Sequence, residues 1–288
     1  MSLITDFIQA QKITDLATAL IRRKTVFAQI SDVRMGFKGS SAQIPVLNSG
    51  TVKDYVPGTD MVTDNVSSSN IKIDLDQSKY ISDYLDDVDE ATATQSALPQ
   101  LLNTLTNNMA NIVDQYALAQ MWDGAGKTSA AELGVTGTPI TVDETNIDDY
   151  LTTIDRILTE SDAPEDGRYA IITPKMLQSL TLNNIYVAAT TDEMARTRGY
   201  RGMYANLEIF VSNNIVAGDY TGDNHSIVAG EKGVFGGIRS ASNVLFNYEK
   251  FRAKEAEDRF GQKYQSVTNY GAGVNTPTYM VWGVVAEA

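Results

Sequence analysis

The sequence predicts an α+β fold: one long helix, an excursion of short strands before it, and a β-rich carboxyl-terminal third. Apolar residues recur at three- and four-residue steps over residues 99–122, which indicates the helix. Period-two alternation broken by turn-forming residues runs from about residue 38 to 85, which indicates strands. After the helix, strands and helices mix without a regular βαβ order, as is typical of the α+β class.

The composition excludes several kinds of chemistry. The chain has 288 residues and 43% hydrophobic content, enough for about two folded domains. It has no cysteine and a single histidine, His225. A disulfide framework, a thiolate nucleophile, cysteine-ligated zinc and any mechanism with two imidazoles are therefore excluded. Because no secretion signal and no run of ~18 apolar residues is visible, we expect no membrane partner.

The net charge of −13 is divided unevenly along the chain. Residues 1–38 carry +3, residues 39–90 carry −7 and residues 91–288 carry −9. Recognition of a phosphate backbone needs clustered Lys and Arg, and the sequence shows no such cluster, so we expect no nucleic-acid reader. A basic arm followed by an acidic excursion instead suggests complementary parts of neighbouring molecules.

The arm and the excursion both lack a core of their own. Ile8, Leu16 and Leu20 fall at helical spacing and predict a short amphipathic helix that needs a partner surface. In the excursion, Pro45 and Pro57 cannot donate to a central ladder, so their strands should lie at an edge or in solvent. At ~3.3 Å per residue, each of two arms of ~20 residues reaches several tens of ångströms. We expect this segment either to be a floppy loop or to lie on another molecule.

Further elements follow the long helix. The apolar period predicts a second helix over 147–160, with Asn146 as its N-cap. An apolar strand is predicted from Arg168, and a short helix opens at Pro174. Residues 183–206 show a weak pattern and are predicted to be a surface loop with some helix. The remaining predicted strands are 207–211, 226–229, 244–251, 262–270 and 278–285.

Three groups of residues could carry chemistry, and each has a simpler interpretation. The run from Asp123 to Ser129 resembles a phosphate-binding loop, but Met121 stands where a glycine is needed and a helix precedes it. We interpret it as a glycine turn and a flexible linker. His225 has no partners that the sequence certifies, so we expect it to be solvated.

The third group is acidic. It could bind calcium or supply two catalytic carboxylates. It precedes a helix, however, where acidic side chains interact favourably with the free N–H groups of the first turn. We therefore predict no enzyme and no cofactor. A carboxylate-dependent hydrolase using Asp86, Asp87 or Asp89 stays open as an alternative, as does a calcium-stabilised surface-layer protein. The group consists of Asp83, Asp86, Asp87, Asp89 and Glu90.

The order of these segments resembles the major capsid proteins of tailed bacteriophages, which have the Hong Kong 97-type fold. Local runs resemble that family as well, although each alone is weakly specific. They are Gly39 to Pro45 with Val52-Lys-Asp-Tyr, Asp76-Gln-Ser-Lys-Tyr, Asp86-Asp-Val-Asp, Ala163-Pro-Glu-Asp-Gly-Arg-Tyr-Ala-Ile-Ile-Thr-Pro, Asp258-Arg-Phe-Gly, and Tyr270-Gly-Ala-Gly-Val with Pro277.

The resemblance implies a division into domains. Residues 1–38 would be an N-terminal arm, and 39–85 an extended β-hairpin loop that crosses a neighbouring subunit. Residues 86–124 and 239–275 would form the peripheral domain with its spine helix. Residues 125–238 would form the axial domain, which 276–288 could rejoin. The self-crosslinking residues of some members cannot be matched here, so that reaction is not carried over.

The resemblance also implies partners. The chain would assemble into hexamers and pentamers of an icosahedral shell in the virion, built in the host cytoplasm, enclosing DNA without sequence-specific binding. A separate scaffolding protein, a portal and optionally a decoration protein would join it, and an encapsulin-like compartment is the alternative. The subunit-interface candidates are Arg22, Arg23, Lys24, Lys53, Asp54, Tyr55, Arg196, Arg198 and Arg201.

Overall fold

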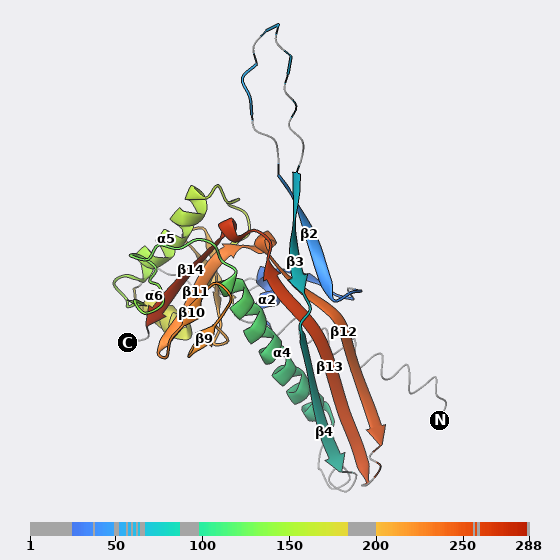
Figure 1. The fold of residues 1–288 in the computed structure, drawn as a ribbon. Coiled ribbons are helices and arrows are strands. Elements are labelled where there is room, and N and C mark those ends of the chain that lie inside the picture. Colours follow the sequence, from blue (N-terminus) through green and yellow to red (C-terminus); the bar gives the residue numbers. More distant parts are fainter. Residues whose placement is uncertain are drawn as a thin grey trace.

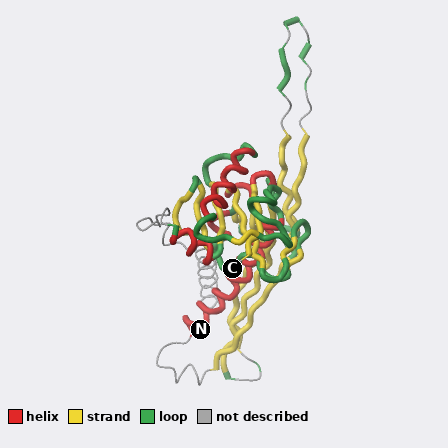
Figure 2. The backbone as a smooth tube through the Cα atoms, turned by 90° about the vertical axis from the view of Figure 1, so that its left-hand side faces the viewer, coloured by secondary structure: helices red, strands yellow, loops and turns green. Residues whose placement is uncertain are grey.

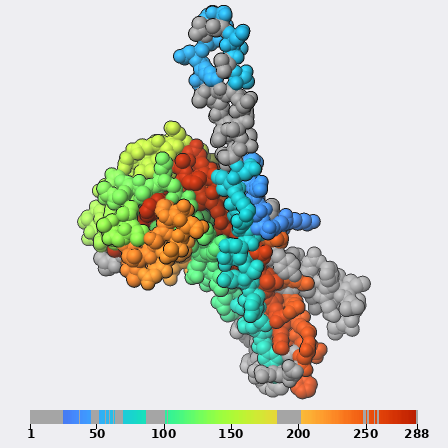
Figure 3. Space-filling model, in the orientation of Figure 1, coloured from blue at the N-terminus to red at the C-terminus, as the bar shows by residue number. Residues whose placement is uncertain are grey.

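The chain forms a rounded body, an elongated sheet with one long helix along it, and a narrow hairpin (Figure 1). The computed structural model describes residues 25–36, 38–48, 52–55, 57–58, 60–61, 63, 67–86, 98–183, 200–255, 257 and 260–286. The hairpin and the elongated sheet extend in opposite directions, and the space-filling view shows the same outline (Figure 3).

The body is built on a six-stranded sheet in the order β5-β14-β11-β6-β8-β7. Neighbouring strands are antiparallel except for the β6–β8 and β14–β5 pairs, which are parallel. The last strand of the chain thus lies between two strands of this sheet. The strands are β5 (Ile140–Thr141), β6 (Arg168–Ile172), β7 (Tyr200–Tyr204), β8 (Leu207–Val211), β11 (Glu231–Ile238) and β14 (Met280–Ala286), with a separate ribbon of β9 (Tyr220–Thr221) and β10 (Ser226–Ile227).

Two helices pack into the core of the body. The first, α5 (Ile147–Glu160), has the predicted bounds and buries one apolar face that includes Leu151 and Ile154. Asn146 stands at its N-cap position, but the Asn146 Oδ1 accepts the N–H of Asp143 (2.8 Å) and caps no helical N–H. The predicted cap is therefore wrong. The second helix, α6 (Pro174–Leu182), is capped by Thr173, whose hydroxyl accepts the N–H of Met176 (3.1 Å).

The elongated sheet has the order β1-β12-β13-β4. Its strands are β1 (Asp32–Arg34), β12 (Ser242–Glu255), β13 (Gly261–Val274) and β4 (Gln77–Asp86). Here β4 pairs along its whole length with β13 and takes no part in the hairpin. The extended loop expected at 39–85 therefore includes most of β4, a strand of the elongated sheet.

The long helix α4 (Leu98–Asp123) confirms the predicted helix over 99–122 and joins the two sheets. At ~1.5 Å per residue it is about 39 Å long. Near its start, Leu105 packs against Tyr264 of the elongated sheet. Near its end, Met121 and Trp122 are fully buried in the core of the body. Figure 2 shows the same arrangement from the side, with the elongated sheet extending below the body.

The hairpin consists of β2 (Ser41–Asn48) and β3 (Ser67–Asp74), paired in register from Ser41 opposite Asp74 to Asn48 opposite Ser67. Pro45 lies in this two-stranded ribbon, which confirms its expected place in an edge strand. Beyond the ladder, Pro57 and Gly58 form a turn near the far end.

Several strands differ from the elements that the sequence predicts. The first is β11, whose Gly233, Gly236 and Gly237 look like turn residues but permit close packing. A Cβ on Gly233 would lie 2.7 Å from Trp122 Nε1, and one on Gly236 would lie 2.7 Å from a methyl group of Ile154. The second is β7, which falls within the loop expected at 183–206. The strand predicted at 226–229 was too long, because only Ser226–Ile227 pairs, with β9.

Arg168 fixes the end of α5 to the start of β6. Its side chain is 2% exposed, and its Nη1 donates to Asp155 Oδ1 (2.6 Å) and to the hydroxyl of Thr159 (2.8 Å). Its Nε and Nη2 donate to the backbone carbonyls of Pro164 (2.9 Å) and Ala163 (2.6 Å). One planar guanidinium thus satisfies four acceptors where the helix turns into the sheet.

Replacing Arg168 with Met should lower the free energy of unfolding by about 2–4 kcal/mol, because Asp155 and the carbonyls lose their donors. Chemical denaturation measures the change. Arg156 is the matched control: it also bridges carboxylates, Glu132 and Glu160, but is 46% exposed. Its replacement by Ala should cost at most about 1 kcal/mol. Equal losses from both variants would show that the burial of Arg168 adds nothing to its ion pair.

Candidate assembly surfaces

The far part of the hairpin exposes large apolar side chains. Val52 is 102% exposed, Tyr55 70% and Met61 82%. Lys53 and Asp54, two of the predicted interface candidates, are exposed beside them. Exposure of apolar side chains of this size to water is unfavourable, so burying them against another surface would stabilise an assembly.

The root of the hairpin is fixed to the elongated sheet. Ala42, Ile73 and Leu75 form a small buried cluster with Leu245 of β12. Gly271 of β13 lies so close to the backbone carbonyl of Asp74 that a side chain there would collide with it. Of the two interpretations of the excursion, the floppy loop is therefore wrong at the root, because this cluster and close approach fix the direction of the hairpin.

A polar contact fixes the same root to α4. The Tyr116 hydroxyl donates to Asp76 Oδ1 (2.7 Å), at the junction of β3 and β4. Burial, and then the neighbouring carboxylate of Asp76, raise the pKa of Tyr116. Tyr270 packs edge-on against Tyr116, with ring centroids 5.4 Å apart, and burial raises its pKa to about 12. Both tyrosines therefore stay protonated at neutral pH.

The base of the arm is held by Asp114 of α4. This residue is 3% exposed, and its Oδ1 accepts the N–H groups of Val26 (2.9 Å) and Phe27 (3.1 Å). Its Oδ2 accepts from Asn214 Nδ2 of the body (2.9 Å). Val26 and Phe27 begin the short helix α2 (Phe27–Ile30), which is buried in the same core. The candidates Arg22, Arg23 and Lys24 lie outside the described residues, directly before this anchored segment.

The arginines predicted to surround a symmetry axis are not brought together by the described residues. Arg196 and Arg198 lie outside these ranges, and only the backbone of Arg201 is described, in β7. Their role in a subunit interface stays a prediction.

The segment after α4 is no flexible linker, contrary to expectation. The Lys127 N–H donates to the carbonyl of Met280 (3.1 Å), and the Lys127 carbonyl accepts from Trp282 (2.8 Å), so the segment pairs with β14. Asp123 accepts the backbone N–H groups of Asp223 (3.0 Å) and His225 (2.7 Å). The N–H groups of Gly124, Gly126 and Lys127 all donate to backbone carbonyls of the protein, so they are not free to hold a phosphate.

His225 is also packed rather than solvated. Its ring stacks on Trp282, with centroids 4.1 Å apart, and its Nε2 lies 2.9 Å from the carbonyl oxygen of Ala125. Trp122 meets both rings edge-on. The one histidine of the chain therefore serves the junction between α4 and the body.

The acidic group does not form a site within the described part of the chain. Asp83 and Asp86 are three residues apart on β4 and so face opposite sides of the sheet. Asp87, Asp89 and Glu90 lie outside the described residues. No group of three or more potential metal ligands occurs among the residues described. Nor is any helix within those ranges long and apolar enough to cross a membrane.

Replacing Asp114 with Ala should lower the free energy of unfolding by about 2–4 kcal/mol, since two buried backbone N–H groups and one partly buried amide lose their acceptor. It should also speed tryptic cleavage at the basic residues around the anchored segment, which limited proteolysis with mass spectrometry measures. The neighbouring Gln115→Ala, at an exposed position of α4, is the control and should behave like the wild type. Unchanged stability in D114A would show that the arm base is held by its apolar contacts alone.

Similar folds occur in solved structures, whereas no protein-family model and no curated protein sequence matches the chain. A chain of Mycobacterium phage Che8 is 23% identical with a TM-score of 0.68, covering 90% of this chain and 91% of that one. The capsid of cyanophage P-SCSP1u is 18% identical with a TM-score of 0.69, covering 93% of this chain and 90% of that one. The mature capsid of bacteriophage PhiM1 is 16% identical with a TM-score of 0.63, covering 92% of this chain and 87% of that one.

These alignments span nearly the whole of both chains. The expected fold class is confirmed: this chain has the α+β, Hong Kong 97-type fold found in the capsids of tailed bacteriophages.

Proposed function

We propose that this chain is a major capsid subunit that assembles into hexamers and pentamers of an icosahedral shell enclosing phage DNA. The proposal rests on the hairpin, which is fixed at its root and exposes apolar side chains without a core of their own at its far end. A projecting segment of this kind is stabilised by contact with a second molecule. The phage capsids among the matched folds support this shell over an encapsulin-like compartment.

Within the shell, each part of the chain has a proposed role. The arm, 1–38, and the loop, with its free hairpin at Ser41–Asp74, would contact neighbouring subunits. The elongated sheet and α4 would form the peripheral domain, which adds β1 and β4 to the elements within the expected ranges 86–124 and 239–275. The body would be the axial domain, 125–238, and the pairing of β14 between β5 and β11 supports its extension to 276–288.

The role proposed for the chain is structural rather than enzymatic. The carboxylates that a hydrolase would use are either on opposite faces of β4 or outside the described residues. A scaffolding protein, a portal and a decoration protein remain proposed partners, and assembly in the host cytoplasm a proposed setting. The exposed hairpin supports only the proposed self-association of the subunit.

Shortening the hairpin tests this function. Replacing residues 49–66 with Asn-Gly keeps the ladder intact, because Asn48 faces Ser67 and a two-residue turn can join them. The variant should fold with an unchanged far-ultraviolet circular dichroism spectrum and a melting temperature within about 3 °C, since the described apolar side chains of the deleted range, Val52, Tyr55 and Met61, are exposed. Closed shells should be lost, as seen by negative-stain electron microscopy and sedimentation velocity.

The control is the triple variant Ser67→Ala, Ser68→Ala, Ser69→Ala, which changes the hairpin chemistry and keeps its length. It should still assemble. Shells formed by the shortened protein would refute the role of the hairpin. A wild-type protein that stays a compact monomer at every salt and crowding condition would refute the capsid function itself. Shells that copurify with an enzyme cargo would favour the compartment.

A further inference from the structure

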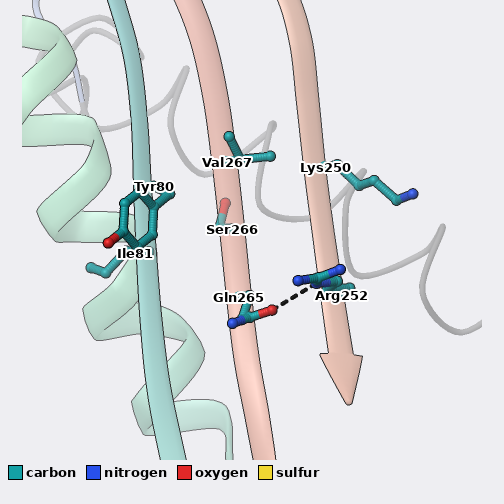
Figure 4. A pocket seen from close by; sticks show the side chains of 7 residues that line it. All are labelled: Tyr80, Ile81, Lys250, Arg252, Gln265, Ser266 and Val267. Atoms are coloured by element: carbon teal, nitrogen blue, oxygen red, sulfur yellow. Dashed lines mark hydrogen bonds between the residues drawn. The ribbon is translucent and has the colours of Figure 1, made fainter.

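The face of the elongated sheet that points away from α4 carries a row of cations. Ile81 packs towards α4 beside Met109, so the adjacent Tyr80, which is 80% exposed, lies on the opposite face. Lys250 of β12 stands in register with Val267 of β13, which stands in register with Tyr80. Figure 4 shows these three side chains across the three strands.

Strand geometry extends the row. Lys250, Arg252 and Lys254 alternate along β12, so they share one face and follow one another at about 7 Å. Lys263 of β13 lies directly opposite Lys254 and adds a fourth cation. We call Lys250, Arg252, Lys254 and Lys263 the basic row.

Few carboxylates neutralise this row. In the described part of the chain, no carboxylate pairs with Lys250 or Arg252. Arg252 is instead held by a neutral chain of hydrogen bonds: its Nε donates to Gln265 Oε1 (2.6 Å), and Gln265 Nε2 donates to Ser82 Oγ (3.0 Å). These contacts hold the guanidinium along the sheet at the edge of a hollow of ≈ 480 Å³ (Figure 4).

The far end of the row contains two acids, Glu257 and Asp86. Glu257 pairs with Lys254, and the hydrogen bond and charge of Lys254, followed by the charge of Lys263, lower the pKa of Glu257. Asp86 stands at the end of β4, opposite Gly261. Glu257 thus offsets the repulsion between Lys254 and Lys263, which face each other directly. Lys250 and Arg252 have no such acid in the described part of the chain, so this part of the row favours an additional anionic partner.

We propose that the basic row contacts the phosphate backbone of double-stranded DNA inside the shell, an inference that rests on the proposed capsid function. The chain as a whole carries −13 and repels phosphate, so a wall that turns this face inward lowers its electrostatic energy against packed DNA. A line of evenly spaced cations on an open, flat face suits a polyanion with regularly spaced charges. Single contacts are weak, and a shell repeats them in every subunit.

The basic row corrects the expectation that the chain lacks clustered Lys and Arg. In the sequence the four residues are interrupted by acidic and apolar ones and divided between two strands. The alternation along β12 and the pairing of β12 with β13 gather them on one face. The contact involves phosphates only and so carries no sequence specificity.

The test uses two variants of equal charge. In the row variant, Lys250, Arg252 and Lys263 are each replaced by Gln. In the control, Lys38, Lys127 and Lys175 are each replaced by Gln, which removes three cations from other surfaces. Fluorescence anisotropy of a labelled duplex of about 20 base pairs measures binding to each purified protein between roughly 25 and 200 mM salt. Circular dichroism checks that both variants fold.

The row variant should bind at least about tenfold more weakly at low salt, and its slope of log K against log salt should fall by about 2–3. The control should keep most of the wild-type slope. Equal weakening in both variants, or none in the row variant, would overturn the proposal. If only the row variant loses shell assembly while keeping its DNA affinity, the row binds an acidic segment of a second subunit instead. A wild type without shells refutes the capsid function but leaves the DNA measurement valid.

Discussion

The whole architecture depends on one helix that serves two cores. The first half of α4 buries Leu105 and Met109 against the elongated sheet, and its second half buries Val113, Met121 and Trp122 in the body. An isolated helix gains little stability from propensity alone, so these two apolar contacts hold it in place. Because the helix is continuous, the orientation of the body relative to the elongated sheet follows from its rigidity.

The same helix carries three polar contacts within ten residues. Asp114 binds the arm base, Tyr116 binds the hairpin root and Asp123 binds the loop at 223–225. In each case a carboxylate accepts N–H or O–H donors from a segment far away in sequence. Asp114 and Asp123 are buried and would be costly if unsatisfied, so they penalise every arrangement in which the arm or the loop docks elsewhere, and the more exposed Tyr116–Asp76 contact adds to the fixing of the hairpin root. The apolar seams supply most of the stability, and these contacts select the arrangement.

Elements with a strong local period could be predicted from the sequence, whereas contacts between distant segments could not. The period fixed α4 and α5 to within a residue at each end, because both helices bury one continuous face. The glycines of β11 have no local signature. They are needed because Trp122 and Ile154, which belong to other elements, leave no room for a side chain there. Likewise, β4 alternates like a hairpin strand, and only its pairing with β13 assigns it to the elongated sheet. Asp114 gave no local signal, since its partner Val26 is 88 residues away. In the basic row, Lys250, Arg252 and Lys254 alternate along one strand, but only the pairing of β12 with β13 brings Lys263 beside them.

The charge pattern acquires its meaning from this geometry. Salt screens charges beyond about 8 Å at physiological ionic strength, so the −13 acts only where surfaces touch. A hairpin fixed at its root by Gly271 and the Leu75 cluster loses less freedom on association than a free loop would. Its exposed apolar end can therefore bind weakly in one pair of molecules and still become stable when many identical contacts close together. Rigidity at the root, with no core at the far end, is what a reversible assembly step requires.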